Sequence, residues 1–144
     1  MFSKVTDESG KVTAIRTSSH AREILDNPLL NKGTAFTATE REELGLHGYL
    51  PMEVETMQSQ VRRVYRQFKE KSDPIEQNIF LYGLHDFNTT LFYRFCAEHI
   101  DEVLPIVYTP TVGDAVEKYS TEFRRPSGVY LSYEHKDRMD EILG

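Results

Sequence analysis

The sequence has very little cysteine and fewer basic than acidic residues. Cys96 is the single cysteine among 144 residues, so an intrachain disulfide framework is excluded. Its apolar neighbours indicate a buried thiol, and the composition fits a reducing compartment, with the cytoplasm as the expected location. The 17 Lys and Arg residues against 23 Asp and Glu give a net charge of -6, which argues against a mainly phosphate-binding role on nucleic acid.

Long apolar runs are also missing. No stretch approaches the roughly 20 residues of a membrane span, and the segment Met1–Gly10 lacks the hydrophobic centre of a secretory signal. We therefore expect neither a membrane nor a nucleic acid as a partner. With 39% hydrophobic residues and no internal repeats or low-complexity linkers, the chain can bury one ordinary core.

The common cofactor and metal motifs do not occur. There is no G-x-G-x-x-G, and Ser9-Gly10-Lys11 fails as a phosphate-binding loop because Val5 stands where the first glycine is required. The five histidines include no pair at i, i+4, so no metal site is expected within this chain. The carboxylates of Glu98–Glu102 would spread over different helix faces, which favours a solvated surface.

The beginning of the chain predicts an extended segment followed by a short helix. Lys4–Val5 and Val12–Ile15 flank the turn residues Asp7–Gly10, a pattern typical of a small hairpin. The next element is a short helix over about residues 21–26, which should stop before Pro28 because a residue that precedes proline rarely stays helical.

The middle of the chain predicts amphipathic helices. Thr37–Glu40 reads as a capping box, which begins a helix that ends near Gly45. Residues 53–71 carry apolar side chains at the spacing of one helix face, namely Val54, Met57, Val61, Val64, Tyr65 and Phe68. Asp73-Pro74 then combines a cap with a proline at the first helical position.

The last third predicts more helix and one late strand. A single helical stretch is expected with one apolar side, formed by Leu91, Phe92, Phe95, Cys96, His99 and Val103. A helix from Pro110 to about Tyr119 follows, Gly128–Tyr133 has the composition of a strand, and Asp137–Leu143 has that of a helix. The predicted fold class is mainly α, with short strands at the N-terminus and near residues 128–133.

The segment Leu104–Gly113 places a tyrosine between an apolar run and a proline-led helix start. Pro105 and Pro110 fix their own φ angles and bias the preceding residues away from the α region, so the backbone at Tyr108 has few alternatives. Such a corner suits a phenol that must meet a carboxylate substrate. On the residues alone, a packed ring with a satisfied hydroxyl is the alternative.

The residues after Tyr108 predict an anion site at a helix start. Thr109 can cap a helix whose first residue is Pro110. The N–H groups of Thr111 and Val112 would then lack intrahelical partners and point toward an anion. Thr111, Val112 and Gly113 are therefore candidate substrate-binding residues.

Three long motifs resemble one enzyme family. They are LLNKGTAFTATEREELGLHGYLP from Leu29 to Pro51, PIVYTPTVG from Pro105 to Gly113, and FRRPSGVYLS from Phe123 to Ser132, with LFYR from Leu91 to Arg94 between them. In order and spacing they resemble the N-terminal part of the long type of malic enzyme. The resemblance covers nearly everything from about Arg16 onward.

The resemblance implies oxidative decarboxylation of L-malate to pyruvate and carbon dioxide. It implies NAD or NADP and a divalent metal, Mg²⁺ or Mn²⁺, in the full-length enzyme. Tyr108 falls on the family's catalytic tyrosine, the general acid that protonates the methylene carbon of enolpyruvate in partnership with a lysine. A phenol with an unperturbed pKa of about 10 needs an environment that lowers this value.

The resemblance also implies that the site is incomplete in this chain. The family's lysine, metal ligands, substrate arginine and nucleotide-binding glycines align beyond Gly144, so no cofactor is expected to bind and the isolated chain should be inactive. It divides the chain into a helical domain, residues 1–126, and the beginning of a central malate-binding domain, residues 127–144. The family's N-terminal helices form much of a homodimer contact. A non-catalytic helical dimerisation module and a fragment of malolactic enzyme are the alternatives.

A regulatory residue is implied as well. Arg63 aligns with an arginine that binds the activator in fumarate-activated members of the family. A second activator arginine falls on Phe87, which cannot pair with a carboxylate. The resemblance thus marks Arg63 as a candidate regulatory residue and argues against strong fumarate activation, and a solvated arginine on a helix face is the simpler alternative.

Overall fold

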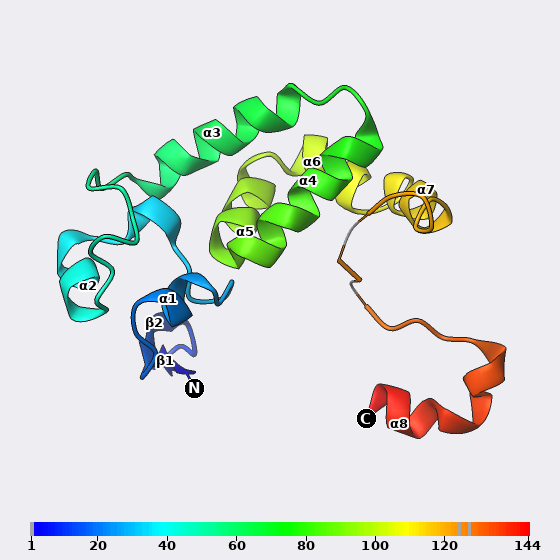
Figure 1. Ribbon diagram of the computed structural model, residues 1–144, viewed down its shortest axis with the longest axis horizontal. Coiled ribbons are helices and arrows are strands. Elements are labelled where there is room, and N and C mark those ends of the chain that lie inside the picture. Colours follow the sequence, from blue (N-terminus) through cyan, green and yellow to red (C-terminus); the bar gives the residue numbers. More distant parts are fainter. Residues whose placement is uncertain (1, 124, 127) are drawn as a thin grey trace.

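The computed structural model describes residues 2–123, 125–126 and 128–144, and it confirms a mainly α fold with short strands (Figure 1). The elements are β1 (Phe2–Thr6), β2 (Val12–Thr17), α1 (Arg22–Leu25), η1 (Gly33–Ala35), α2 (Ala38–Glu43), α3 (Met57–Lys69), α4 (Pro74–Phe87), α5 (Thr89–Glu98), α6 (Ile100–Val107), α7 (Thr111–Glu117), η2 (Tyr133–Arg138) and α8 (Met139–Leu143). In the described ranges, no helix is both long and apolar enough to cross a bilayer.

Four helices enclose the main core. In Figure 1, the long helix α3 lies along one side of α4, α5 and α6. Their apolar faces meet in a cluster of Val61, Val64, Phe68, Leu81, Leu91, Phe92, Phe95, Val103 and Ile106. The α3 members of this cluster have the spacing that predicted an amphipathic helix, because residues three and four apart share one helix face.

The helix starts follow the predicted capping chemistry. The Thr37 side chain accepts from the Glu40 N–H and the Glu40 carboxylate accepts from the Thr37 N–H, which completes the capping box of α2. At α4, Asp73 accepts from the Ile75 N–H and Pro74 occupies the first helical position. These local bonds satisfy main-chain N–H groups that a helix start otherwise leaves unpaired.

The N-terminal part forms a second, smaller unit of packing. The predicted hairpin is confirmed, since β1 and β2 pair antiparallel across a turn in which the Asp7 carboxylate accepts from the N–H groups of Ser9 and Lys11. A second apolar cluster, formed by Ile24, Leu30, Phe36 and Leu46, lies between α1, α2 and the loops around them.

One buried arginine bonds main-chain carbonyls of η1 and of the segments between η1 and α3. The Arg41 guanidinium donates hydrogen bonds to five main-chain carbonyls, those of Thr34, Phe36, Pro51, Met52 and Glu53. Because a buried charge needs such partners, this side chain fixes the path of the loop that leads into α3.

The single helix predicted around Leu91 and Val103 is wrong in its extent. The chain leaves the α conformation at His99, where φ is -126° and ψ is 35°, and α6 starts there in a new direction. The His99 carbonyl accepts from the N–H groups of the first turn of α6. The break brings Val103 and Ile106 into the core that α3, α4 and α5 share.

The strand predicted at Gly128–Tyr133 is also wrong. The described residues from 128 to 132 form no strand, and a 3₁₀ helix, η2, begins at Tyr133. A strand needs a neighbouring strand to bond its main chain, and β1 and β2 pair only with each other. Two residues of the FRRPSGVYLS motif, Arg124 and Ser127, lie outside the described residues, and the division at 126/127 stays a prediction.

Candidate functional site

Tyr108 lies at a corner between α6 and α7 that its own main chain fixes on both sides. Its N–H donates to the Leu104 carbonyl at 2.9 Å, which closes the last turn of α6. Its carbonyl accepts from the Val112 N–H at 3.0 Å, within the first turn of α7. Between these bonds Tyr108 is extended, with φ -130° and ψ -158°. These two bonds hold the main chain at Tyr108 on both sides, which agrees with the predicted restriction of the backbone at this residue.

Asn78 supports this corner from α4, and sequence reasoning missed it. In a continuing helix the Ile106 carbonyl would accept from the N–H of residue 110, but Pro110 has none. The Asn78 Nδ2 instead donates to the Ile106 carbonyl at 2.7 Å, and Asn78 is completely buried. The signal was available, because a proline four residues after a helical carbonyl leaves that carbonyl in need of another donor.

Two local predictions at the corner are wrong. Pro105 does not keep Leu104 out of the helix, because α6 contains both residues and the lost bond falls on the carbonyl of the exposed Asp101. Thr109 does not cap α7. Helix α7 begins at Thr111 with Pro110 as its N-cap and no side-chain cap, and the Thr109–Pro110 peptide is cis.

The anion site predicted at the N–H groups of Thr111 and Val112 is contradicted at one of the two groups. The Val112 N–H donates to the Tyr108 carbonyl, and the Gly113 N–H next to it donates to the Pro110 carbonyl at 2.9 Å. The Val112 N–H is therefore already paired within the chain, and substrate binding by Thr111, Val112 and Gly113 stays a prediction. Thr111 is buried, Val112 is half-buried and Gly113 is exposed, so the three candidate substrate-binding residues do not share one open surface.

The Tyr108 side chain projects away from the core. It is 65% exposed, and in the described part of the chain no side chain or main-chain group hydrogen-bonds to its hydroxyl. The alternative of a packed ring with a satisfied hydroxyl thus does not apply to this chain. The hydroxyl is free to meet a partner that approaches from outside.

The described residues contain no cluster of metal-ligating side chains. No three side chains of His, Cys, Asp or Glu in ranges 2–123, 125–126 and 128–144 lie close enough together to hold one. Likewise the carboxylates around His99 are engaged with neighbours. Glu102 accepts from the Lys69 Nζ at 2.8 Å and the Tyr65 hydroxyl at 3.1 Å, and these bonds lower the pKa of Glu102 while the same carboxylate raises the pKa of Lys69.

Cys96 and Arg63 have different surroundings. Cys96 is half-buried, and burial raises the pKa of its thiol to about 11, which makes it a poor nucleophile. Arg63 on α3 pairs with the Glu55 carboxylate at 2.6 Å, and the Thr34 hydroxyl also bonds to Glu55. Phe87, at the end of α4, is 62% exposed. The candidate regulatory arginine is therefore already neutralised by an acid of its own chain.

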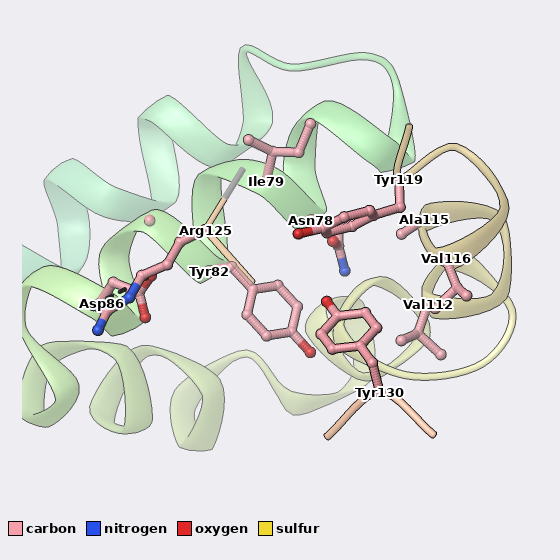
Figure 2. A pocket seen from close by; sticks show the side chains of 11 residues that line it. Asn78, Ile79, Tyr82, Asp86, Val112, Ala115, Val116, Tyr119, Arg125 and Tyr130 are labelled. Atoms are coloured by element: carbon pink, nitrogen blue, oxygen red, sulfur yellow. Dashed lines mark ion pairs between the residues drawn. The ribbon is translucent and has the colours of Figure 1, made fainter. Parts of the chain in front are cut away.

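A cavity of about 420 Å³ lies between α4, α7 and the segment after α7 (Figure 2). Figure 2 shows Asp86 and Arg125 at one end and the α7 side chains at the other, with tyrosine rings between them. Its lining residues include Tyr82, Val112, Val116, Tyr119 and Tyr130, whereas Tyr108 is not among them. The cavity and the exposed phenol are thus separate features.

Comparison with known proteins agrees with the motifs. Residues 85–144 match the family model "Malic enzyme, N-terminal domain", a range that includes the Tyr108 corner, α7 and the C-terminal segment. The match gives the corner a counterpart in other proteins.

Full-length relatives are similar over most of the chain. NAD-dependent malic enzyme 3 of Bacillus subtilis (strain 168) is 49% identical over 140 residues, which are 97% of this chain and 24% of the relative. The NAD-dependent malic enzymes of Aeromonas hydrophila and Pseudomonas savastanoi are 47% and 48% identical over 120 residues, 83% of this chain and 21% of each relative. The chain spans about a quarter of the length of the curated relatives that it matches.

Proposed function

Since this chain belongs to the malic enzyme family through its N-terminal domain, we propose that it supplies the catalytic tyrosine of a malate-decarboxylating site. One observation carries the proposal. Tyr108 stands on a corner fixed by its own main chain, with its hydroxyl exposed and unpaired in the described part of the chain. A general acid must be able to reach its substrate, and an exposed hydroxyl on a residue with a fixed main chain supports this role.

The reaction we propose is the oxidative decarboxylation of L-malate to pyruvate and carbon dioxide. After carbon dioxide leaves, the Tyr108 phenol would donate its proton to the methylene carbon of the enol, and the enol hydroxyl would lose its proton to a base in another part of a longer enzyme. The products are the methyl group and the carbonyl of pyruvate. The names of the relatives support NAD over NADP as hydride acceptor. They also do not favour the alternative of a malolactic fragment.

The cofactors would have to be held by other parts of a longer enzyme. NAD would accept the hydride, and a divalent metal would polarise the substrate carbonyl. The described residues include neither a cluster of metal ligands nor a glycine-rich dinucleotide motif. The contribution of this chain is therefore the acid and its support, with Asn78 positioning the corner through the Ile106 carbonyl.

The experiment replaces Tyr108 in the longer enzyme that contains this chain. Tyr108→Phe should lower kcat about 10²–10⁴-fold, since it removes a general acid and leaves the ring in place. KM for malate should change little. Tyr49→Phe, at a tyrosine after α2 that is 51% exposed and outside the helices proposed to contact a second copy, is the matched control. Full activity of Tyr108→Phe would remove this residue from the mechanism, as would an equal loss in the control.

The isolated chain gives a second test. We propose that it does not turn over malate, because the metal and nucleotide sites lie elsewhere. Malate-dependent NADH formation by the purified chain, measured at 340 nm with Mg²⁺ or Mn²⁺ present, would contradict the proposal.

We also propose that the N-terminal helices contact a second copy of the chain. Tyr93, Ile100 and Leu104 are about half exposed or more and lie on neighbouring helices α5 and α6, which supports an interface there. The same contact supports the alternative function, in which the chain is a dimerisation module without catalysis. Sedimentation at several concentrations tests it, and a strictly monomeric chain would count against the interface.

Arg63 remains a proposed regulatory residue. An anionic activator would have to compete with Glu55 for its guanidinium, and Phe87 offers no second cation. Weak activation at most is therefore expected. Fumarate titration of the longer enzyme and of Arg63→Gln tests the role, and identical titrations would exclude Arg63 from regulation.

A further inference from the structure

The cavity between α4 and α7 has the size and the chemistry of a small-molecule site. Its volume of about 420 Å³ falls within the range of pockets that enclose drug-sized ligands. Its walls are mainly apolar or aromatic, and its charged groups are confined to one end, as Figure 2 shows. A ligand that fits it would therefore have an apolar body and a charged head.

The charged end can take both signs of charge. The Asp86 carboxylate has two contacts, one with the Arg125 NH1 at 3.9 Å and one with the His85 Nδ1 at 3.5 Å. Both are at the outer limit of an ion pair or hydrogen bond, so neither saturates the carboxylate. The Arg125 side chain is 71% exposed and has further N–H donors. An ammonium could meet Asp86 while a carboxylate meets Arg125.

The body of the cavity suits a flat apolar group. Figure 2 shows Tyr82 and Tyr130 between the charged end and the α7 side chains Val112 and Val116. Tyrosine rings bind another ring well, because offset and edge-to-face contacts add to the burial of apolar area. The order along the cavity is thus charge, aromatic walls and an aliphatic end.

Gly83 forms part of the cavity wall. It lies inside α4, where glycine is less favourable than alanine, and it lines the cavity. A Cβ built at this position meets no atom within 4 Å. The missing side chain is therefore not required by crowding, and a larger residue would enter the space.

From these features we propose that the cavity binds a free α-amino acid with an aromatic side chain. The ammonium pairs with Asp86, the carboxylate with Arg125, and the ring lies among the tyrosines. This site is separate from Tyr108 and does not depend on the malate reaction. A segment of polypeptide is the other possible occupant.

Three probes that differ by one charged group test whether the ligand needs both an ammonium and a carboxylate. L-Phenylalanine has both charges, 2-phenylethylamine lacks the carboxylate, and 3-phenylpropionate lacks the amine. Titration of the chain by NMR, read at the amides of α4 and α7, should give binding of phenylalanine at least about tenfold tighter than of either analogue, because each loses one charge-assisted hydrogen bond. Equal affinities would overturn the zwitterionic head, and no binding of any probe would overturn the proposal of an amino-acid site.

Two variants locate the binding. Gly83→Leu should abolish it by filling the cavity, whereas Gly83→Ala, which favours the helix, should leave a folded reference. Arg125→Gln changes an exposed side chain and should remove the preference for phenylalanine over phenylethylamine without unfolding the chain. If phenylalanine binds Gly83→Leu and Arg125→Gln as it binds the original chain, the site is elsewhere and the proposal is wrong.

Discussion

Apolar side chains are buried in the helical core but exposed in the C-terminal segment. Phe95 and Val103 are completely buried among α3, α4, α5 and α6, whereas Val129 and Leu131 are 58% and 59% exposed. In Figure 1 the C-terminal segment leads away from these helices to α8. Both parts have apolar patterns in their sequence, so a pattern alone does not create structure. An apolar pattern leads to packed structure only where a second apolar surface of the chain packs against it.

The largest predicted effect is the loss of stability when a side chain of the helical core is truncated. Phe95→Ala should lower the free energy of unfolding by about 3–5 kcal/mol, because it leaves a cavity in the packed core. Tyr133→Ala, at a side chain that is 82% exposed, should change it by less than about 0.5 kcal/mol. Urea unfolding followed by circular dichroism measures both. Similar losses at the two positions would show that the C-terminal segment is packed as firmly as the core.

The next effect concerns the buried charge. Arg41→Met should cost about 2–4 kcal/mol, since main-chain carbonyls that accepted its hydrogen bonds lose their donor. Arg62→Met is the control, because Arg62 is exposed on α3. Unfolding in urea at one pH is the measurement. If Arg41→Met leaves the free energy of unfolding unchanged, water replaces the hydrogen bonds of the guanidinium at no cost in stability.

A smaller effect is expected at a helix start. Thr37→Ala removes the side-chain half of the capping box of α2 and should cost about 1 kcal/mol. Thr39→Ala, two residues later on the exposed face of the same helix, should be neutral or slightly stabilising. Thermal unfolding of the pair separates the cap from helix propensity, and the opposite order would contradict the capping role.

The smallest effect is a dependence on pH. Hydrogen bonds from Lys69 and Tyr65 hold the pKa of Glu102 below the ordinary value of a glutamate side chain. A carboxyl with a lowered pKa stabilises the fold above its unfolded pKa, and this contribution disappears as the pH falls through the folded pKa. Any advantage of the original chain over Glu102→Gln should therefore shrink as the pH falls below about 4.5.

Glu70→Gln is the reference for that measurement, because Glu70 is exposed and has no ion-pair partner in the described part of the chain. Urea unfolding from about pH 6 to about pH 3 compares the variants. A difference between the original chain and Glu102→Gln that stays constant over this range would exclude the ionised carboxylate as its source.

Local chemistry made much of the fold predictable. The apolar face of α3, the capping box at Thr37 and the Asp73-Pro74 start of α4 are short-range patterns, and each formed as predicted. The hairpin followed from its turn residues. These elements satisfy their own main chain, so a reading of neighbouring residues is enough to find them.

Long-range partners account for what could not be predicted. Asn78 and Ile106 are 28 residues apart, and only the packing of α4 on α6 brings the amide to the carbonyl. The break at His99 depends on how α6 enters the core, and the missing strand at 128–132 depends on a partner strand. A break between two helices near Tyr108 was predictable from Pro110, whereas the continuation of α6 through Pro105 and the pairing of the Val112 N–H were not.

The five carbonyls around Arg41 have a consequence for proteolysis. A protease must draw several residues of extended chain into its active site, but the residues on both sides of Arg41 are bound to its own guanidinium or lie in α2. Trypsin can cut after Arg41 only when the guanidinium has left these carbonyls and α2 has unwound around it. The rate of that single cleavage would therefore report how often Arg41 releases the loop that leads into α3.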